Sequence, residues 1–164
     1  MTKLKTAFLA IGIFFIFWIF LAGTSFQELL TGLIISIILT LLFYHKLELL
    51  ADIKLNPRSI VFMFLYLFVF AGELIKANVD VARRVISTKL PINPGIVKVK
   101  TKLKTPLGRA ILANSITLTP GTLTVELKDD FFYIHWIDVT NDNIEGATEA
   151  IVAKFEKYLE VIFG

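Results

Sequence analysis

Three stretches without a charged side chain lie in the first half of this 164-residue chain, at Thr6–Gly23, Leu29–Tyr44 and Ser59–Gly72. The first is the clearest, because it includes AFLAIGIFFIFWIFLAG and has lysines only at Lys3 and Lys5 before it. An uncharged apolar run of about 18 residues is typical of a helix that crosses a membrane. We therefore predict an α-helical membrane half, with apolar helices over about 4–23, 29–45 and 58–87.

The three apolar runs are short for membrane spans. At about 1.5 Å per residue they extend over roughly 27, 24 and 21 Å, whereas the hydrocarbon core of a bilayer is about 30 Å thick. Burial against other subunits relieves such a mismatch, so we expect a larger assembly. A cleaved signal peptide is disfavoured, because the first run is long for one and a second apolar run follows almost at once.

The polar turn Thr24–Glu28 predicts a tight hairpin between the first two helices. Thr24 or Ser25 can cap the second helix, and Glu28 in its first turn suits the helix dipole. Three small residues recur every four positions in that helix: Gly32, Ser36 and Thr40. They share one face, which predicts close packing of another helix; a row of hydroxyls that binds ions is the alternative.

The third helix is predicted to change character along its length. Its first half is apolar, whereas its second half has a charged stripe and an opposite apolar stripe. The charged stripe comprises Glu73, Lys76, Asp80, Arg83 and Arg84, and the apolar stripe comprises Ile75, Val79, Ala82 and Ile86. Glu73, near the membrane edge, is either an ion-pair partner of Lys76 or a group beside an ion path. Asn78 is a second polar candidate on this helix.

Charge is distributed unevenly along the chain, whose net charge is +3. Every charged residue from Val81 to Val125 is positive, whereas acids outnumber bases from Glu126 onward. A basic segment after a membrane helix is typical of the cytoplasmic side and is attracted to anionic lipid. We interpret it as a topology signal and expect no nucleic-acid binding, because no aromatic residues interleave with these charges.

The distribution of basic residues conflicts with a topology in which the N-terminus is cytoplasmic and all three apolar helices cross the membrane. Five basic residues flank the hairpin and would then all lie inside: Lys3, Lys5, Lys46, Lys54 and Arg58. A third full span would, however, export the basic segment that follows it. Either the N-terminus is outside, or one apolar run is not a full span. We expect residues 1–90 to form the membrane part and residues 91–164 a cytoplasmic domain.

The remaining residues predict a small α+β domain. Its predicted elements are a strand at Ile96–Thr101, a helix from Thr105-Pro106 to about Ile116, strands at Thr122–Leu127 and Phe131–Asp138, and a final helix capped by Asn141 or Asp142. The first two strands follow from apolar alternation, and the third is apolar on both faces except at His135. The helices follow from caps and apolar stripes. The order β-α-β-β-α favours two layers, with both helices on one face of the sheet.

The run LANSITLTPGTLTV at Leu112–Val125, followed by YIHWID at Tyr133–Asp138, resembles the E subunit of the Mrp (also called Mnh) multisubunit cation/proton antiporters. FVFAGELIKANVDVARRVI at Phe68–Ile86 extends the resemblance over nearly the whole chain. It implies a multi-pass plasma-membrane subunit of a Na⁺/H⁺ antiporter that supports assembly and forms part of the cation route. The implied partners are large subunits similar to those of respiratory complex I, small F and G subunits, and membrane lipid.

The TLTPGT run also has a physical interpretation as an ordered turn. Pro120 fixes φ, Gly121 permits a positive φ, and Thr117 and Thr119 can hydrogen-bond local backbone. We interpret the turn either as a helix-to-strand connection or as a docking or cation-adjacent site. His135 is either a structural residue of the sheet or a proton relay, since histidine titrates near neutral pH. With Glu73 and Asn78, these residues are our candidates for the ion path or for assembly.

An enzyme is not indicated by any motif. The chain has no cysteine, no nucleotide-binding loop, no glycine-rich fingerprint and no clustered nucleophile and base. We therefore expect no catalytic residue, no metal site and no cofactor. A stand-alone membrane-anchored adaptor is the alternative to an antiporter subunit, because a helical hairpin with a cytoplasmic domain would look similar without the family motif.

Overall fold

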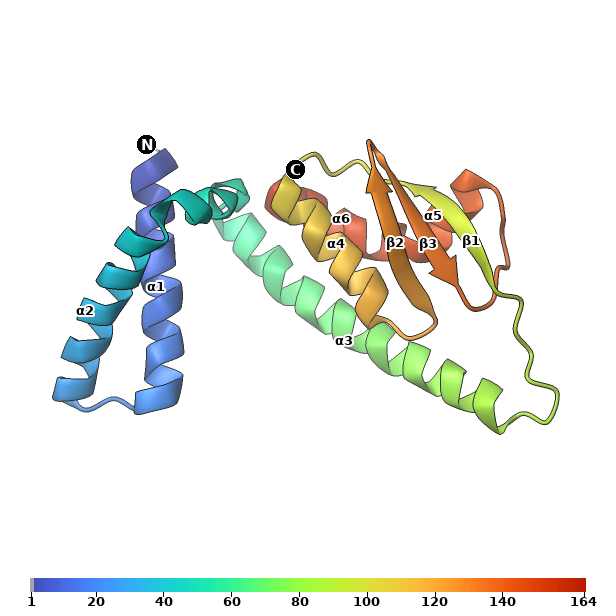
Figure 1. The fold of residues 1–164 in the computed structure, drawn as a ribbon, viewed down its shortest axis with the longest axis horizontal. Helices are drawn as coiled ribbons and strands as arrows, with labels where there is room; N and C mark the ends of the chain where they lie inside the picture. Colours follow the sequence, from blue (N-terminus) through green and yellow to red (C-terminus); the bar gives the residue numbers. More distant parts are fainter. Residues whose placement is uncertain (1) are drawn as a thin grey trace. The chain divides into compact units, whose positions relative to one another are not determined.

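The computed structural model describes residues 2–164, apart from the side chains of residues 2, 3, 48 and 49, so the side chain of Lys3 lies outside the described part. The chain divides into two compact units (Figure 1). We call the first, which ends at Ile53, the hairpin unit, and the second, Lys54–Gly164, the α+β unit.

The hairpin unit consists of α1 (Thr2–Ala22), α2 (Phe26–Leu42) and the 3₁₀ segment η1 (Tyr44–Asp52). Gly23 makes the turn with a φ of +111°, a conformation that glycine adopts without steric cost. Ser25 then caps α2, since its Oγ accepts from the Glu28 N–H at 3.3 Å while a Glu28 carboxylate oxygen accepts from the Ser25 N–H at 2.8 Å. This reciprocal capping box fixes the start of α2 three residues before the predicted one.

The second apolar helix ends earlier than predicted. It stops at Leu42, and the chain bends by 83° into η1. The bend coincides with the end of the apolar run, where His45 and Lys46 follow. By length and composition, α1 (from Leu4) and α3 (Pro57–Ile86) can each cross a membrane, and α2 with η1 makes a third crossing only if the bent pair is one broken span.

The α+β unit contains one long helix, a three-stranded sheet and three shorter helices. Its elements are α3 (Pro57–Ile86), β1 (Gly95–Lys100), α4 (Pro106–Leu118), β2 (Thr122–Lys128), β3 (Phe131–Trp136), α5 (Ile144–Ile151) and α6 (Ala153–Phe163). The sheet is antiparallel with the order β1-β3-β2. The structure therefore confirms the prediction of a helical N-terminal part with apolar helices, followed by a small sheet with helices.

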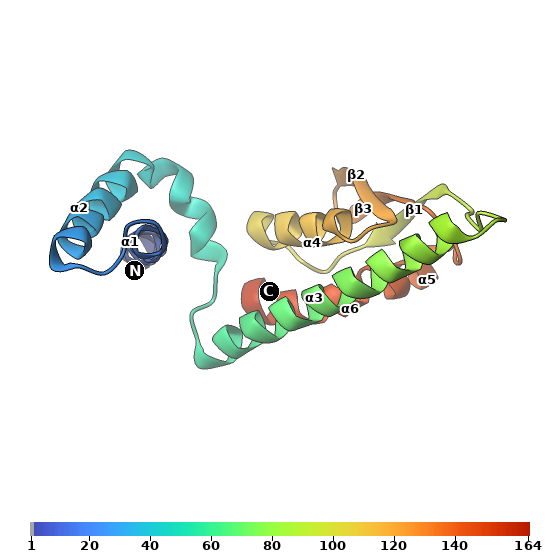
Figure 2. The same cartoon turned by 90° about the horizontal axis from the view of Figure 1, so that it is seen from below.

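One face of the sheet forms the core. Val97 pairs with Ile134 and Val99 with Phe132, and all four side chains are buried on that face. Helix α4 packs against β2 and α5 packs against β1, while α6 lies against α4. Figure 2 shows the strands on one side of the unit and α3 with α6 on the other. The opposite sheet face leaves Ile96, Leu123 and His135 exposed.

The predicted final helix is two helices, with a break at Val152. The predicted caps Asn141 and Asp142 are wrong, because the Asn143 Oδ1 accepts from the Gly146 N–H at 2.6 Å and begins α5 there. The break follows from the packing. α5 follows β1, whereas α6 packs along α3, and one straight helix would not follow both.

Helix α3 is the 30-residue element predicted near 58–87. Asn56 caps it by accepting from the Ser59 N–H at 2.7 Å, and Pro57 occupies the first turn. One side packs against α6, where the Tyr66 and Phe70 rings lie 6.5 and 6.2 Å from that of Phe155. The third apolar helix thus belongs to the same compact unit as the C-terminal strands.

Candidate functional site

A pocket of about 340 Å³ lies in the α+β unit, beside the TLTPGT turn. Four elements line it: the second half of α3, the turn from α4 to β2, the chain that leaves β3, and the join between α5 and α6. Its polar lining includes Glu73, Asp80, Arg84, Thr119, Asp138 and Lys154. The pocket brings Glu73, Thr119, Pro120 and Gly121 together from positions far apart in the sequence.

Local hydrogen bonds order the TLTPGT turn. The Thr119 hydroxyl donates to the Ser115 carbonyl at 2.7 Å, and the Thr122 hydroxyl donates to the Ile116 carbonyl at 2.6 Å. Gly121 has a φ of +91°, and a Cβ at this position would lie 2.9 Å from Ile137. A side chain at position 121 would therefore meet both backbone strain and a close contact.

Two groups of ion pairs join α3 to the rest of the unit. The Glu73 carboxylate lies 2.7 Å from the Lys76 ammonium and 3.0 Å from the Lys154 ammonium of α6. Further along α3, Arg84 lies 2.7 Å from the Asp80 carboxylate and 2.9 Å from that of Asp138, which follows β3. The predicted Glu73–Lys76 pair is present, and Glu73 also reaches across to a second helix.

The other candidate residues lie outside this pocket. Asn78 is exposed, and its amide donates to the Leu74 carbonyl one turn back at 2.8 Å. Thr117 is exposed, and its hydroxyl oxygen accepts from the Thr124 N–H at 3.1 Å. His135 is exposed on the outer face of the sheet. The structure therefore separates these three residues from Glu73.

Several contacts that position α3 were not predicted from the sequence. The Tyr66 hydroxyl is hydrogen-bonded to that of Ser115, which in turn donates to the Ile111 carbonyl at 2.6 Å. A signal for this contact was available, because a tyrosine within an apolar run needs a partner for its hydroxyl. No comparable local signal points to Lys154 as the partner of Glu73, since these residues are distant in sequence.

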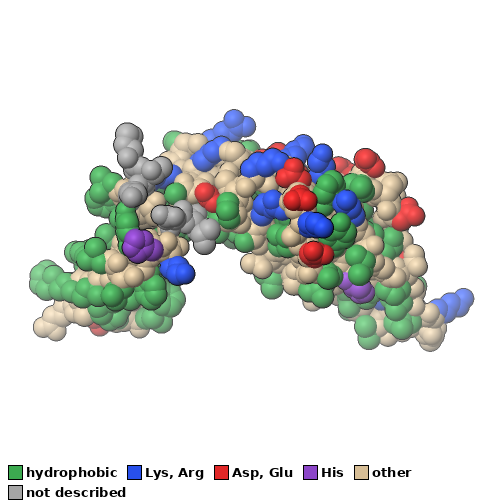
Figure 3. Space-filling model, turned by 45° about the horizontal axis from the view of Figure 1, so that its top comes forward, with side chains coloured by type: hydrophobic (Ala, Val, Ile, Leu, Met, Phe, Trp, Pro, Cys, Tyr) green, Lys and Arg blue, Asp and Glu red, His purple; other side chains and the backbone are tan. Residues whose placement is uncertain are grey.

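Charged side chains of both signs gather on the α+β unit toward the β2–β3 turn (Figure 3). The Lys98 ammonium lies 3.9 Å from the centre of the Phe131 ring on the outer sheet face. The Lys104 ammonium lies 2.7 Å from the Asp130 carboxylate, and this hydrogen bond lowers the pKa of Asp130 below its ordinary value. The Lys104 and Asp130 side chains are both exposed to solvent.

The predicted packing face of α2 is buried within the hairpin unit. Gly32, Ser36 and Thr40 are its buried residues, and α2 packs against α1. The Ser36 hydroxyl donates to the Gly32 carbonyl at 2.7 Å and the Thr40 hydroxyl donates to the Ser36 carbonyl at 2.8 Å. A Cβ on Gly32 would lie 2.2 Å from the Trp18 ring. The geometry thus favours helix packing over an ion-binding row.

The site and the fold together define a class of protein. Apolar helices of membrane length are joined to a small α+β unit, in which ion pairs surround a polar pocket. Among the residues that the structure describes, no three His, Asp or Glu side chains gather to hold a metal ion. This is the organisation of a membrane-embedded protein with a compact polar domain.

Comparison with known proteins identifies the family within this class. The model of the family described as "Na+/H+ ion antiporter subunit" matches residues 11–162. The chain therefore belongs to the family of Na⁺/H⁺ antiporter E subunits, and the resemblance to the Mrp antiporters is confirmed.

Individual relatives support the same family. The chain is 35% identical to the Na(+)/H(+) antiporter E subunit of Bacillus subtilis (strain 168), over 88% of this chain and 90% of that protein. It is 54% identical to the corresponding E subunit of Alkalihalophilus pseudofirmus over a shorter match that covers 44% of this chain and 47% of that protein.

A solved structure is similar over nearly the full length. It is a chain from the membrane-bound sulfane sulfur reductase, described as an archaeal respiratory membrane complex. The TM-score is 0.85 at 44% identity, over 96% of this chain and 99% of that chain. The fold therefore also occurs in a chain of a respiratory membrane complex.

Proposed function

We propose that this chain is a non-catalytic membrane subunit of a multisubunit Na⁺/H⁺ antiporter, in which it supports assembly and contributes to the cation route. The observation that carries the proposal is the family match over residues 11–162. The surface of the apolar helices supports it, because large side chains such as Phe8, Phe20 and Phe68 are mostly exposed within the chain itself. Lipid and partner subunits would cover such side chains.

The proposed placement is the plasma membrane, with residues 1–90 as the membrane part and residues 91–164 on the cytoplasmic side. The basic segment from Arg83 to Arg109 supports this orientation, because positive charge is retained on the cytoplasmic side of membranes. The partners proposed are large antiporter subunits that resemble those of complex I, together with the small F and G subunits.

We assign the pocket residues to assembly and the cation route. Glu73 joins two helices through Lys154, and the Thr119–Gly121 turn lines the same pocket. The exposed Asn78, Thr117 and His135 are proposed contact points for neighbouring subunits. Glu73→Gln tests the pocket carboxylate. Glu149→Gln is the matched control, because it neutralises an exposed carboxylate that does not line the pocket.

The antiport measurement separates the two proposed roles of Glu73. Antiport in vesicles should fall with Glu73→Gln at unchanged subunit content if Glu73 acts on the cation route. It should fall together with subunit content if Glu73 acts in assembly. Unchanged antiport and unchanged subunit content would remove Glu73 from both roles.

A second candidate is a subunit of a respiratory membrane complex that carries an antiporter-like part. The identity of 44% to the reductase chain, over nearly all of both chains, favours it. Deletion of the gene distinguishes the two candidates. Loss of an antiporter subunit should leave cells sensitive to Na⁺ at alkaline pH, whereas loss of a respiratory subunit should lower membrane-bound electron transfer. Unchanged behaviour in both assays would favour a stand-alone membrane-anchored adaptor.

A further inference from the structure

Contacts between α3 and the rest of the α+β unit extend along nearly the whole helix. The Ser59 hydroxyl donates to the Val161 carbonyl at 2.9 Å near the start of α3, and Arg84 pairs with Asp138 at 2.9 Å near its end. Tyr66, bonded to Ser115, lies between them. At about 1.5 Å per residue, the contacts from Ser59 to Arg84 extend over about 38 Å, which exceeds a hydrocarbon core of about 30 Å.

This contact pattern is incompatible with α3 as a membrane span. If α3 crossed the bilayer, the unit docked along it would enter the membrane as well. β2 is an edge strand that pairs with another strand on one side only, and its Glu126 and Lys128 are exposed. Open sheet edges and exposed charges are not tolerated in the hydrocarbon region. Either the unit detaches from α3, or α3 does not cross.

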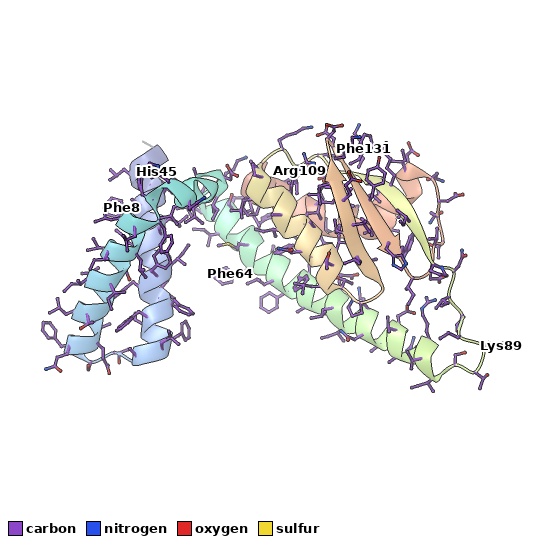
Figure 4. The ribbon with its side chains drawn as sticks, in the orientation of Figure 1. Phe8, His45, Phe64, Lys89, Arg109 and Phe131 are labelled. Carbon is purple, nitrogen blue, oxygen red and sulfur yellow. The ribbon has the colours of Figure 1, made fainter. Side chains whose placement is uncertain are left out.

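The exposed side of α3 carries an apolar stripe from end to end. Its exposed members include Val61, Phe64, Phe68, Ile75, Val79 and Ile86, and in the first half of α3 the exposed Ile60, Met63, Leu65 and Leu67 widen it. Figure 4 shows the Phe64 side chain on the side of α3 that faces away from α4 and the strands. A membrane span needs apolar residues on all sides, whereas this stripe continues for several turns beyond Glu73 while ion pairs occupy the opposite side. An apolar stripe opposite a charged one is the pattern of a helix that lies in a membrane surface.

We propose that α3 lies along the membrane surface, with this stripe in the boundary between headgroups and acyl chains. The exposed bases Lys54 and Arg58 at one end, and Arg83 and Lys89 at the other, are placed to contact anionic headgroups. Figure 4 marks Lys89 in the chain that follows α3. The proposal goes beyond the proposed function, because it holds for either complex.

The surface position of α3 also removes the conflict between charge and topology. With only the hairpin crossing the bilayer, the two ends of the hairpin lie on the same side. Lys5, Lys54 and the basic segment after α3 then all face the cytoplasm, as the charge rule favours. One apolar run is therefore not a full span, and that run is α3.

The absence of cysteine makes the orientation of α3 directly measurable. The single substitutions Lys54→Cys and Lys89→Cys place one thiol just before the start of α3 and one just after its end. Thr24→Cys in the hairpin turn is the control. A membrane-impermeant maleimide is applied to right-side-out and inverted vesicles that hold the full complex, and labelling is read on the tagged chain. We expect positions 54 and 89 to label from the same side, with loss of labelling in the other vesicle orientation, and position 24 to label from the opposite side.

Labelling of positions 54 and 89 from opposite sides would overturn the proposal, as would labelling at neither end. A depth measurement on nitroxides at Val61, Phe68, Ile75 and Ile86 gives a second test that depends on no single variant. A surface helix places all four at a similar shallow depth, whereas a span gives a depth that rises and falls along the helix. Partner subunits that fail to co-purify would contradict the proposed function but would leave the labelling pattern of α3 unchanged.

Discussion

The hairpin unit and the α+β unit are each stabilised by a different kind of buried side chain. Small residues are buried in the hairpin unit: Thr6 and Ala10 on α1, with Gly32, Ser36 and Thr40 on α2. The α+β unit instead buries large ones, among them Phe132, Ile134 and Phe155. The comparison shows that the α+β unit builds its own core, whereas the hairpin depends on close backbone approach and on surroundings that lipid or partner subunits supply.

The buried hydrogen bonds of the two units also differ in the sequence separation of their partners. In the hairpin unit the buried hydroxyls of Ser36 and Thr40 bond to carbonyls four residues back. In the α+β unit the buried Glu156 carboxylate accepts from the Thr101 hydroxyl at 2.5 Å and from the Lys102 N–H at 2.8 Å, far away in sequence. Four matched pairs of substitutions test this difference between the two units.

The largest effect is expected in the sheet core. Phe132→Ala removes a fully buried ring and should lower the free energy of unfolding by about 3–5 kcal/mol. Its neighbour Phe131 points to the other face, beneath Lys98, so Phe131→Ala should cost much less. Thermal unfolding of the detergent-solubilised chain measures both. Equal losses would show that the outer sheet face is as tightly packed as the core.

A smaller effect is expected in the hairpin. Gly32→Ala places a methyl group against the Trp18 ring and should cost about 1–3 kcal/mol through overpacking. Gly12→Ala is the matched control, because no atom lies within 4 Å of a Cβ at that position. The yield of assembled complex and its thermal stability are the measurements. Unchanged yield and thermal stability in Gly32→Ala would mean that close approach of α1 and α2 does not stabilise the hairpin.

A third substitution tests the buried carboxylate of the α+β unit. Glu156→Gln keeps an oxygen acceptor but removes the charge, so the hydrogen bonds from Thr101 and Lys102 should weaken by about 1 kcal/mol in total. The exposed Glu149→Gln should leave stability unchanged. The two variants are compared by thermal unfolding. Identical behaviour would show that the Glu156 charge contributes nothing to this unit.

The smallest effect is expected at the surface, where Lys104 lowers the pKa of Asp130. A carboxyl group whose pKa is lower in the folded protein than in the unfolded chain stabilises the fold above the unfolded value, near 3.9. This contribution is lost as the pH falls through the lowered folded value. Lys104→Gln should therefore be slightly less stable than the parent chain at pH 7 and equally stable in acid. A stability difference between Lys104→Gln and the parent chain that persists at low pH would show that it does not arise from the ionised Asp130. Lys128→Gln is the control.

Sequence reasoning identified what local chemistry determines. Ser25 and Thr105 accept hydrogen bonds from N–H groups three residues ahead, and such caps can be recognised from a few residues of sequence. The apolar alternation of β1 was equally visible, and β3 was predicted as a strand that is apolar on both faces except at His135. The cap of α5 was misplaced by one or two residues because Asn141, Asp142 and Asn143 are all suitable caps, and only the fold selects Asn143.

Long-range packing could not be predicted in the same way. The apolar run of α3 matches a membrane span in composition, and only the contacts of Tyr66, Glu73 and Arg84 show that one side of it is occupied by the C-terminal strands and helices. The break at Val152 likewise reflects competition between two packing partners. The pocket gathers Glu73 and the TLTPGT turn for the same reason, since no local pattern determines which helix faces which loop.

The account depends most on the chain being one embedded subunit among several. The direct measurement is the mass and subunit content of the complex that a tagged copy of this chain brings down from native membranes in mild detergent. We predict a single large species that contains several multi-pass membrane proteins. A tagged chain that migrates by itself, or that alkaline carbonate removes from the membrane, would contradict this account.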